Sequence, residues 1–164
     1  MTEDRSVSDS PASMSPRHVV LELIKAASEG DFVKCLDLHS EDVVVTLPFM
    51  LPEPVVYEGK AAQRTQLDDP QWRAGIPRMY HDMEYRDVVV HETTDPHVVV
   101  VQWNFVSRIG GQTVVHPNIQ VSEVRDGKIV RTTDYHNHVV RAVANGNAQE
   151  QIEIIEDMVL PEDR

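Results

Sequence analysis

The chain has little of what several classes of protein require. Its one cysteine, Cys35, excludes an internal disulfide framework and suits a reducing compartment such as the cytosol. No apolar run approaches the roughly 18 residues of a membrane helix, and the polar, acidic start has no apolar core of a signal peptide. Only 15 Lys and Arg residues stand against 27 Asp and Glu residues, whereas phosphate binding needs clustered cations. We therefore expect a cytoplasmic protein with neither a membrane nor a nucleic acid as partner.

The composition that remains is that of one globular domain. Hydrophobic residues make up 41% and charged residues 26% of 164 positions, which is enough for a packed core. Residues 1–15 are polar and predict a disordered lead-in. We expect the domain over 16–140 and a tail with a short helix over 141–164, and no internal repeat indicates a second domain.

The N-terminal part predicts two short antiparallel helices. Ser15 can cap the first helix and Pro16 suits its first turn, and an apolar face follows at Val20, Leu23, Ile24 and Ala27. Gly30 ends this helix and Asp31 can cap the next. The second helix has its apolar face at Phe32, Cys35 and Leu36 and is expected to end near Ser40.

A first strand over 42–46, a proline-rich loop over 47–59 and a third helix over 60–67 are predicted next. Asp69-Pro70 stops that helix, and residues 71–80 have no clear pattern.

The second half predicts a β meander. Strand patterns cover 82–92, 97–108, 112–124 and 128–138, with turn signals at Thr94-Asp95-Pro96, Gly110-Gly111 and Asp126-Gly127. These connections are too short for parallel crossovers, so the pairing should be antiparallel. After a break at Asn145-Gly146-Asn147, an acidic tail helix is predicted from Ile152, Ile155 and Val159.

Four stretches in this order resemble the SnoaL-like branch of the nuclear-transport-factor-2-like superfamily. They are VLELIKAASEGDFVKCLDLHSEDVVV (20–45), LPFMLPEPVVYEGK (47–60), TTDPHVVVVQWNF (93–105) and VRDGKIVRTTDYHN (124–137). The second is similar to a loop of phenazine-biosynthesis A/B-type proteins. The likeness covers roughly 18–140. It implies an α+β fold: a cone-shaped barrel of N-terminal helices on a strongly curved mixed or antiparallel sheet, enclosing one small-molecule pocket. It also implies a homodimer.

Alternation along the strand 114–124 separates two sets of side chains. His116, Asn118, Gln120 and Ser122 share one face, and Val115, Ile119 and Val121 share the other. Either the polar set lines the pocket and the apolar set forms a dimer face, or the polar set is a solvated outer surface. The family pattern favours the inward arrangement, although a slip of one residue would reverse it.

Asp134 is the first candidate catalytic residue. Its position resembles that of a carboxylate acting as acid or base in limonene-epoxide-hydrolase-type and phenazine-type proteins. A carboxyl group in an apolar hollow is desolvated, so its pKa rises toward neutrality and it can exchange protons near pH 7. The alternative is a surface aspartate at a strand end, or a partner for Arg131 or Arg141. His136 should share the face of Asp134 and could divide the proton transfer with it, or it could be a structural histidine at the rim.

The chain departs from the related mechanisms at several positions. Ketosteroid isomerases hold their general base where this chain has Leu47 and a catalytic tyrosine where it has Leu23. The epoxide hydrolases need an arginine and a second aspartate where it has Val101 and Trp103. The resulting wall of Val45, Leu47, Val101 and Trp103 would be apolar. Trp103 and Phe105 could flank a flat ligand or simply pack in the core.

These residues predict a cofactor-independent enzyme of secondary metabolism. It would cyclise, isomerise or dehydrate a hydrophobic, aromatic or polyketide-like small molecule, with Asp134 and His136 as catalytic residues. The predicted substrate-binding residues are Leu47, Trp103, Phe105, His116, Asn118 and Gln120. A non-catalytic binding protein and an accessory subunit of a biosynthetic enzyme are the alternatives. We expect no metal, since His136 and His138 lack an obvious third ligand, and we expect His81, His91 and His97 at the surface.

Overall fold

A computed structural model describes residues 14–70, 73 and 83–159. The predicted lead-in up to residue 13, the segment 71–80 apart from residue 73, and His81 lie outside the described residues.

The three predicted N-terminal helices are confirmed. They are α1 (Pro16–Ser28), α2 (Phe32–Asp37) and α3 (Lys60–Asp68). The side chain of Ser15 accepts a hydrogen bond from the backbone N–H of His18, and that of Asp31 accepts one from Lys34. Both caps satisfy N–H groups that the first helical turn leaves without an internal partner.

Six strands form one curled sheet. They are β1 (His39–Leu47), β2 (Val55–Glu58), β3 (Glu84–Glu92), β4 (Val98–Ile109), β5 (Gln112–Arg125) and β6 (Lys128–His136), in the order β2-β1-β6-β5-β4-β3. The meander from β3 to β6 is antiparallel, as predicted. β1 pairs with β6 in parallel, which the long intervening chain permits and a short turn would not.

The proline-rich segment is only partly a loop, which corrects the prediction for 47–59. Val55–Glu58 forms β2, an antiparallel edge strand on β1. The prolines of this segment precede β2, so they remove no hydrogen bond from it. Valine and tyrosine within β2 favour extended backbone.

The C-terminal part also differs from the prediction. β6 ends at His136 rather than at residue 138, and two helices follow instead of one: α5 (His138–Asn145) and α6 (Ala148–Val159). Asn137 caps α5, with its Oδ1 accepting a hydrogen bond from the N–H of Val140 at 3.1 Å. Gly146, at φ 76°, ends α5 in the left-handed conformation, so the predicted break at 145–147 is confirmed.

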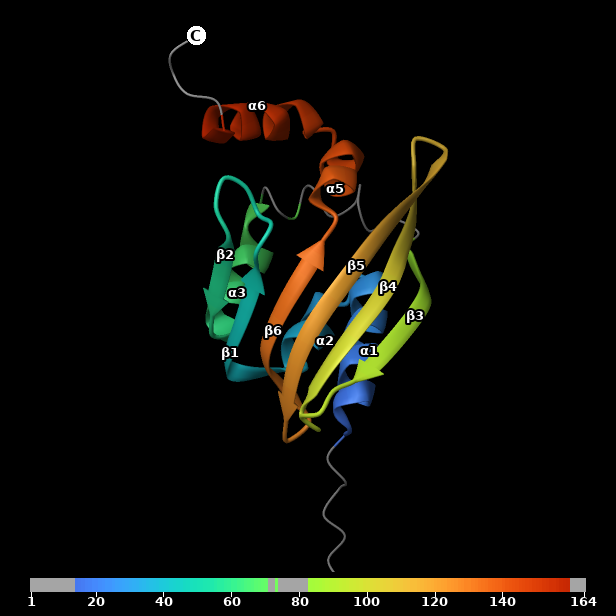
Figure 1. Ribbon diagram of the computed structural model, residues 1–164, viewed down its shortest axis with the longest axis vertical. Coiled ribbons are helices and arrows are strands. Elements are labelled where there is room, and N and C mark those ends of the chain that lie inside the picture. Colours follow the sequence, from blue (N-terminus) through green and yellow to red (C-terminus); the bar gives the residue numbers. More distant parts are fainter. Residues whose placement is uncertain (1–13, 71–72, 74–82, 160–164) are drawn as a thin grey trace, which may run out of the picture.

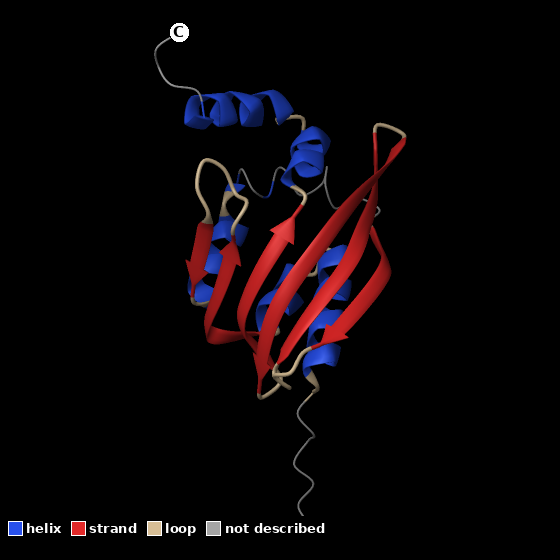
Figure 2. Ribbon diagram, in the orientation of Figure 1, coloured by secondary structure: helices blue, strands red, loops and turns tan. Residues whose placement is uncertain are grey.

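The helices α1, α2 and α3 lie together on one face of the sheet, while α5 and α6 continue beyond the end of β6 (Figure 1). Figure 2 shows that the strands curl around this helical layer. The core lies between the two layers and comprises Val19, Val20, Ile24, Val43, Val99, Val101, Trp103, Val124 and Ile129, among others. None of the described helices is both long enough and apolar enough to cross a membrane.

Candidate functional site

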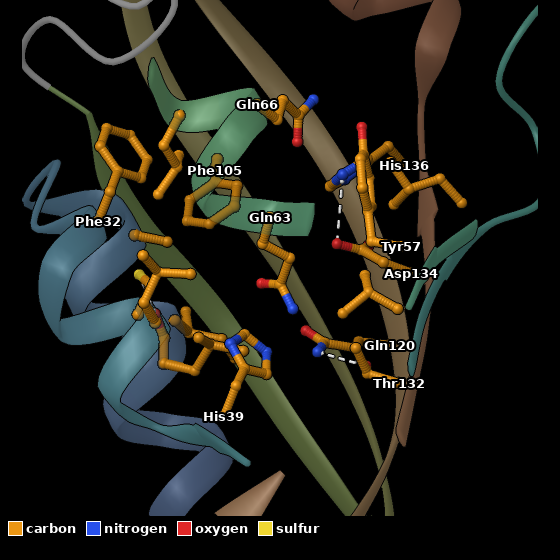
Figure 3. A pocket seen from close by; sticks show the side chains of 18 of the residues that line it. Phe32, His39, Tyr57, Gln63, Gln66, Phe105, Gln120, Thr132, Asp134 and His136 are labelled. Atoms are coloured by element: carbon orange, nitrogen blue, oxygen red, sulfur yellow. Dashed lines mark hydrogen bonds and ion pairs between the residues drawn. The ribbon is translucent and has the colours of Figure 1, made fainter. Parts of the chain in front are cut away.

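A cavity of about 200 Å³ lies where the helical layer and the concave face of the sheet do not close against each other. Its apolar wall comes from both layers and includes Leu23, Phe32, Val45, Leu47, Trp103 and Phe105. Figure 3 shows Phe32 and His39 on one side of the cavity and Gln120, Asp134 and His136 on the strand side. The cavity is smaller than the roughly 300–1,000 Å³ of drug-sized sites, so it suits a compact ligand.

Most of the predicted site residues line this cavity: Leu47, Trp103, Phe105, Gln120, Asp134 and His136. His116 and Asn118 instead line an adjoining hollow of about 30 Å³, which also touches Phe105 and His136. Val101 was predicted in the cavity wall, and that was wrong. It is fully buried in the core, because its position on β4 lies deeper under α1.

The alternation of β5 places its polar side chains inside, as the family resemblance favoured. His116, Asn118, Gln120 and Ser122 are all buried, whereas Val115 and Ile119 are exposed. Gln120 donates a hydrogen bond from Nε2 to Thr132 Oγ1 at 2.6 Å, and Thr132 Oγ1 is 3.0 Å from Ser122 Oγ. The buried hydroxyl and amide groups therefore satisfy one another across β5 and β6.

Asp134 presents a desolvated carboxyl group to the cavity. Its side chain keeps 18% of its exposure, but Oδ1 is buried and has no hydrogen-bond partner among the described residues. Burial raises the pKa of Asp134 from 3.8 to about 7, and the positive charge of Arg141 opposes part of that rise. The group can therefore exist in both protonation states near neutral pH.

His136 contacts Asp134 in a defined tautomer. His136 Nε2 lies 3.2 Å from Asp134 Oδ2, and His136 Nδ1 lies 3.0 Å from Asn118 Oδ1. Asn118 donates through Nδ2 to the carbonyl oxygen of His116 at 2.6 Å, and this contact assigns the orientation of its amide. Asn118 Oδ1 must then accept from His136 Nδ1–H, so the neutral ring presents the lone pair of Nε2 to Asp134.

This tautomer leaves room for one proton between Asp134 Oδ2 and His136 Nε2. Burial lowers the pKa of His136 to about 3, so the proton resides on the carboxyl group. Once Asp134 is ionised, two lone pairs face each other across this contact. That repulsion acts in the same direction as desolvation and makes the ionised carboxylate a stronger base.

Arg141 is a cavity residue that the sequence interpretation placed in the tail and named only as an alternative partner of Asp134. It belongs to the first turn of α5 and lines both hollows. Burial and the charge of Arg141 together lower the pKa of His116 and His138, whereas at Asp134 the charge of Arg141 opposes the larger effect of burial. The signal that could have found it is Asn137, a favoured N-cap residue directly after the last strand, which predicts a helix returning over the sheet.

Tyr57, Gln63 and Gln66 were also missed. Tyr57 lies on β2, the strand hidden in the predicted loop, and lines the cavity together with Gln66 of α3. Gln63 reaches from α3 into the space between His39 and Gln120 (Figure 3). Polar residues on a short amphipathic helix are ordinarily solvated, so only the tertiary structure identifies these as cavity residues.

Four buried polar atoms of the cavity residues have no hydrogen-bond partner among the described residues: His39 Nδ1, Gln63 Nε2, Trp103 Nε1 and Asp134 Oδ1. Buried polar groups are hydrogen-bonded in the large majority of cases. Burial lowers the pKa of His39 to about 4, so its ring is neutral. The cavity therefore offers polar contacts that a bound molecule can complete.

The remaining predicted histidines do not line the cavity. His91 and His97 are exposed, as predicted, and His138 packs edge-on against His136 with ring centroids 5.7 Å apart. Within the part of the chain that the structure describes, no three His, Cys, Asp or Glu side chains are grouped to share a metal ion.

The fold and the site define a class of protein, an α+β cone with an internal pocket that bears an acidic residue. The model of the SnoaL-like domain family matches residues 20–132, and the chain belongs to that family. It is similar to the uncharacterized protein YesE of Bacillus subtilis (strain 168), with 30% identity over 129 residues, 76% of this chain and 83% of that one.

Two solved structures share the fold. A candidate isomerase from Bacillus subtilis has a TM-score of 0.66 at 25% identity, over 82% of this chain and 97% of that one. A candidate polyketide cyclase from Pseudomonas putida has a TM-score of 0.55 at 24% identity, over 76% and 92% of the two chains. This fold carries many activities, so the chemistry has to be argued from the site.

Proposed function

We propose that the protein is a cofactor-independent enzyme in which Asp134 and His136 transfer a proton within a hydrophobic small molecule. The observation that carries the proposal is the carboxyl group of Asp134, which lines an apolar cavity with one oxygen beside His136 and the other without a hydrogen-bond partner among the described residues. The reaction would be a cyclisation, isomerisation or dehydration in secondary metabolism. The name of the Bacillus subtilis candidate isomerase supports this class of reaction.

Each residue has a distinct role in the proposed step. Ionised Asp134 removes a proton from the substrate and returns it at another atom, which is effective because its pKa of about 7 lies near ambient pH. His136, held by Asn118, accepts a hydrogen bond from the protonated carboxyl group and so keeps it oriented toward the cavity. The apolar wall excludes water and keeps the carboxylate poorly solvated.

The elimination of 5-nitrobenzisoxazole tests this proposal without knowledge of the natural substrate. In this reaction a base removes the C3 proton, the C–H electrons complete a nitrile, and the N–O bond breaks to release a coloured phenolate. We expect catalysis by the full chain to rise with pH through an apparent pKa of about 7. Asp134→Asn should lower the rate at least about a hundredfold, the usual contribution of a positioned base.

Asp157→Asn provides the matched control, because Asp157 is an exposed residue of α6. It should leave the rate unchanged. Equal rates in the wild type and Asp134→Asn would overturn the proposal. If the rates are equal and calorimetry still shows that the chain binds the probe, the alternative of a non-catalytic binding protein is favoured.

A further inference from the structure

The guanidinium group of Arg141 differs from those of the other described arginines in its burial and in its contacts. Among the arginines that the structure describes, only Arg141 is half-buried, and the others are exposed. Arg73, Arg86 and Arg125 each contact a carboxylate within 2.7 Å. Arg141 has no hydrogen bond or ion pair through its side chain to any described residue. A half-buried guanidinium group that lines a cavity and has no carboxylate bound to it is suited to hold an anionic group of a ligand.

The groups around Arg141 do not neutralise it. The facing titratable residues are Asp134 and His136 of β6, His116 of β5, His138 of α5 and Tyr57 of β2. Four of these five are histidines or a tyrosine, which carry no negative charge near neutral pH. Asp134 is the one carboxyl group among the described residues named here, and its pKa of about 7 leaves it protonated about half of the time at neutral pH. The cavity is thus locally positive in a chain whose net charge is −12.

The unpartnered atoms of the cavity add hydrogen-bond donors to this positive charge. Trp103 Nε1 and Gln63 Nε2 are buried, line the cavity and have no acceptor among the described residues. Both atoms can only donate. A ligand that satisfies these two donors must carry acceptor atoms, and an oxyanion among its acceptors would match the charge of Arg141.

We propose that the cavity binds an acidic small molecule: a compact ring system packed against Trp103 and Phe105, with an ionised carboxylate or enolate-type oxyanion held by Arg141. Trp103 and Phe105 meet edge to face with ring centroids 5.5 Å apart and provide the apolar surface for the ring. The inference rests on the proposed function in taking this cavity as the substrate site. The anion is held by Arg141, and the carboxyl group of Asp134 is not one of its ligands.

Calorimetric titration with 2-naphthoate and its neutral amide, 2-naphthamide, tests the inference. The two probes share the ring, and only the first carries a charge. We expect the wild-type chain to bind 2-naphthoate roughly tenfold more tightly, the size of a charge-assisted hydrogen bond. Arg141→Gln should abolish this preference while leaving the affinity for 2-naphthamide within about twofold. Arg131→Gln, which removes an exposed arginine of β6, should retain it.

Equal affinity of the wild type for the two probes would overturn the inference, as would an undiminished preference in Arg141→Gln. If Arg141→Gln does not fold, the wild-type comparison of the two probes decides alone. Asp134→Asn separates the two proposals, because it should keep the preference for 2-naphthoate. If the elimination rate does not depend on Asp134 but the wild type still prefers 2-naphthoate, only the acid–base proposal is wrong. If the elimination rate depends on Asp134 but the wild type binds both probes equally, only the anion site is wrong.

Discussion

At Asp134 the requirements of chemistry and of stability oppose each other. Ionising a carboxyl group whose Oδ1 is buried and unpartnered costs free energy in the folded state that the unfolded chain does not incur. The pKa is raised in the folded state from 3.8 to about 7, so folding stability should fall as pH rises between these values and level off above them. A residue that only supported the fold would not be expected at such a position.

Asp134→Asn should therefore stabilise the protein at neutral and alkaline pH. We expect a gain of up to about 4 kcal/mol in the free energy of unfolding at about pH 8, and little change at about pH 3, where the aspartate is largely protonated in both states. Urea unfolding at the two pH values measures the difference. A variant that is less stable than the wild type at the higher pH would contradict the raised pKa.

Asn118 shows how much the site depends on a residue with no charge. Its amide nitrogen is engaged by the His116 carbonyl, so its oxygen sets the tautomer of His136 and with it the contact to Asp134. The family resemblance favoured an inward position of Asn118, which the structure confirms. The direction in which its amide points depends on the pairing of β5 with β6, which a single-strand pattern does not contain.

Among the elements, α5 is the one that completes the site. It starts directly after β6, and the Asn137 cap determines where its first turns lie relative to the cavity. Arg141 lies one turn beyond the cap, and its backbone N–H bonds to the carbonyl oxygen of Asn137 at 3.1 Å. The helix start is thus coupled directly to the position of the proposed anion site.

Asn137→Ala should weaken that coupling. Loss of an N-cap costs about 1 kcal/mol of helix stability, so α5 should fray and Arg141 should be less well positioned. We expect the variant to bind 2-naphthoate several-fold more weakly while its affinity for 2-naphthamide stays the same, both measured by calorimetry. Asn137→Ser, which can still cap, is the control. A parallel loss for both probes would indicate a general disturbance of the cavity instead.

At the scale of the whole molecule, the outer face of the sheet carries exposed apolar side chains that no element of the described chain covers. Val115, Ile119 and Tyr135 are 46%, 42% and 37% exposed, and they face away from the helical layer. We propose that this face forms the interface of a homodimer, as the resemblance to the SnoaL-like proteins implied. An apolar surface of neighbouring strands is a typical sign of a protein interface.

Ile119→Glu should convert the dimer to a monomer, because it places a charge at the centre of the proposed interface. Light scattering coupled to size exclusion should report twice the chain mass for the wild type and the single chain mass for the variant. Val33→Glu, at an exposed position of α2 away from this face, should remain a dimer. A monomeric wild type would exclude the interface.

The sequence by itself determined the α+β class, the caps at Ser15 and Asp31, the four strands of the meander and which side chains of β5 share a face. These features arise from interactions between residues close in the chain and from alternation, which a single segment expresses. Only the tertiary structure decided that β1 joins β6 in parallel, that Val55–Glu58 becomes an edge strand, and that Arg141, Gln63 and Tyr57 face the same cavity as Asp134. Those outcomes depend on contacts between segments far apart in the sequence. The packing of these segments removes water from the carboxyl group of Asp134 and places the guanidinium group of Arg141 at the same cavity.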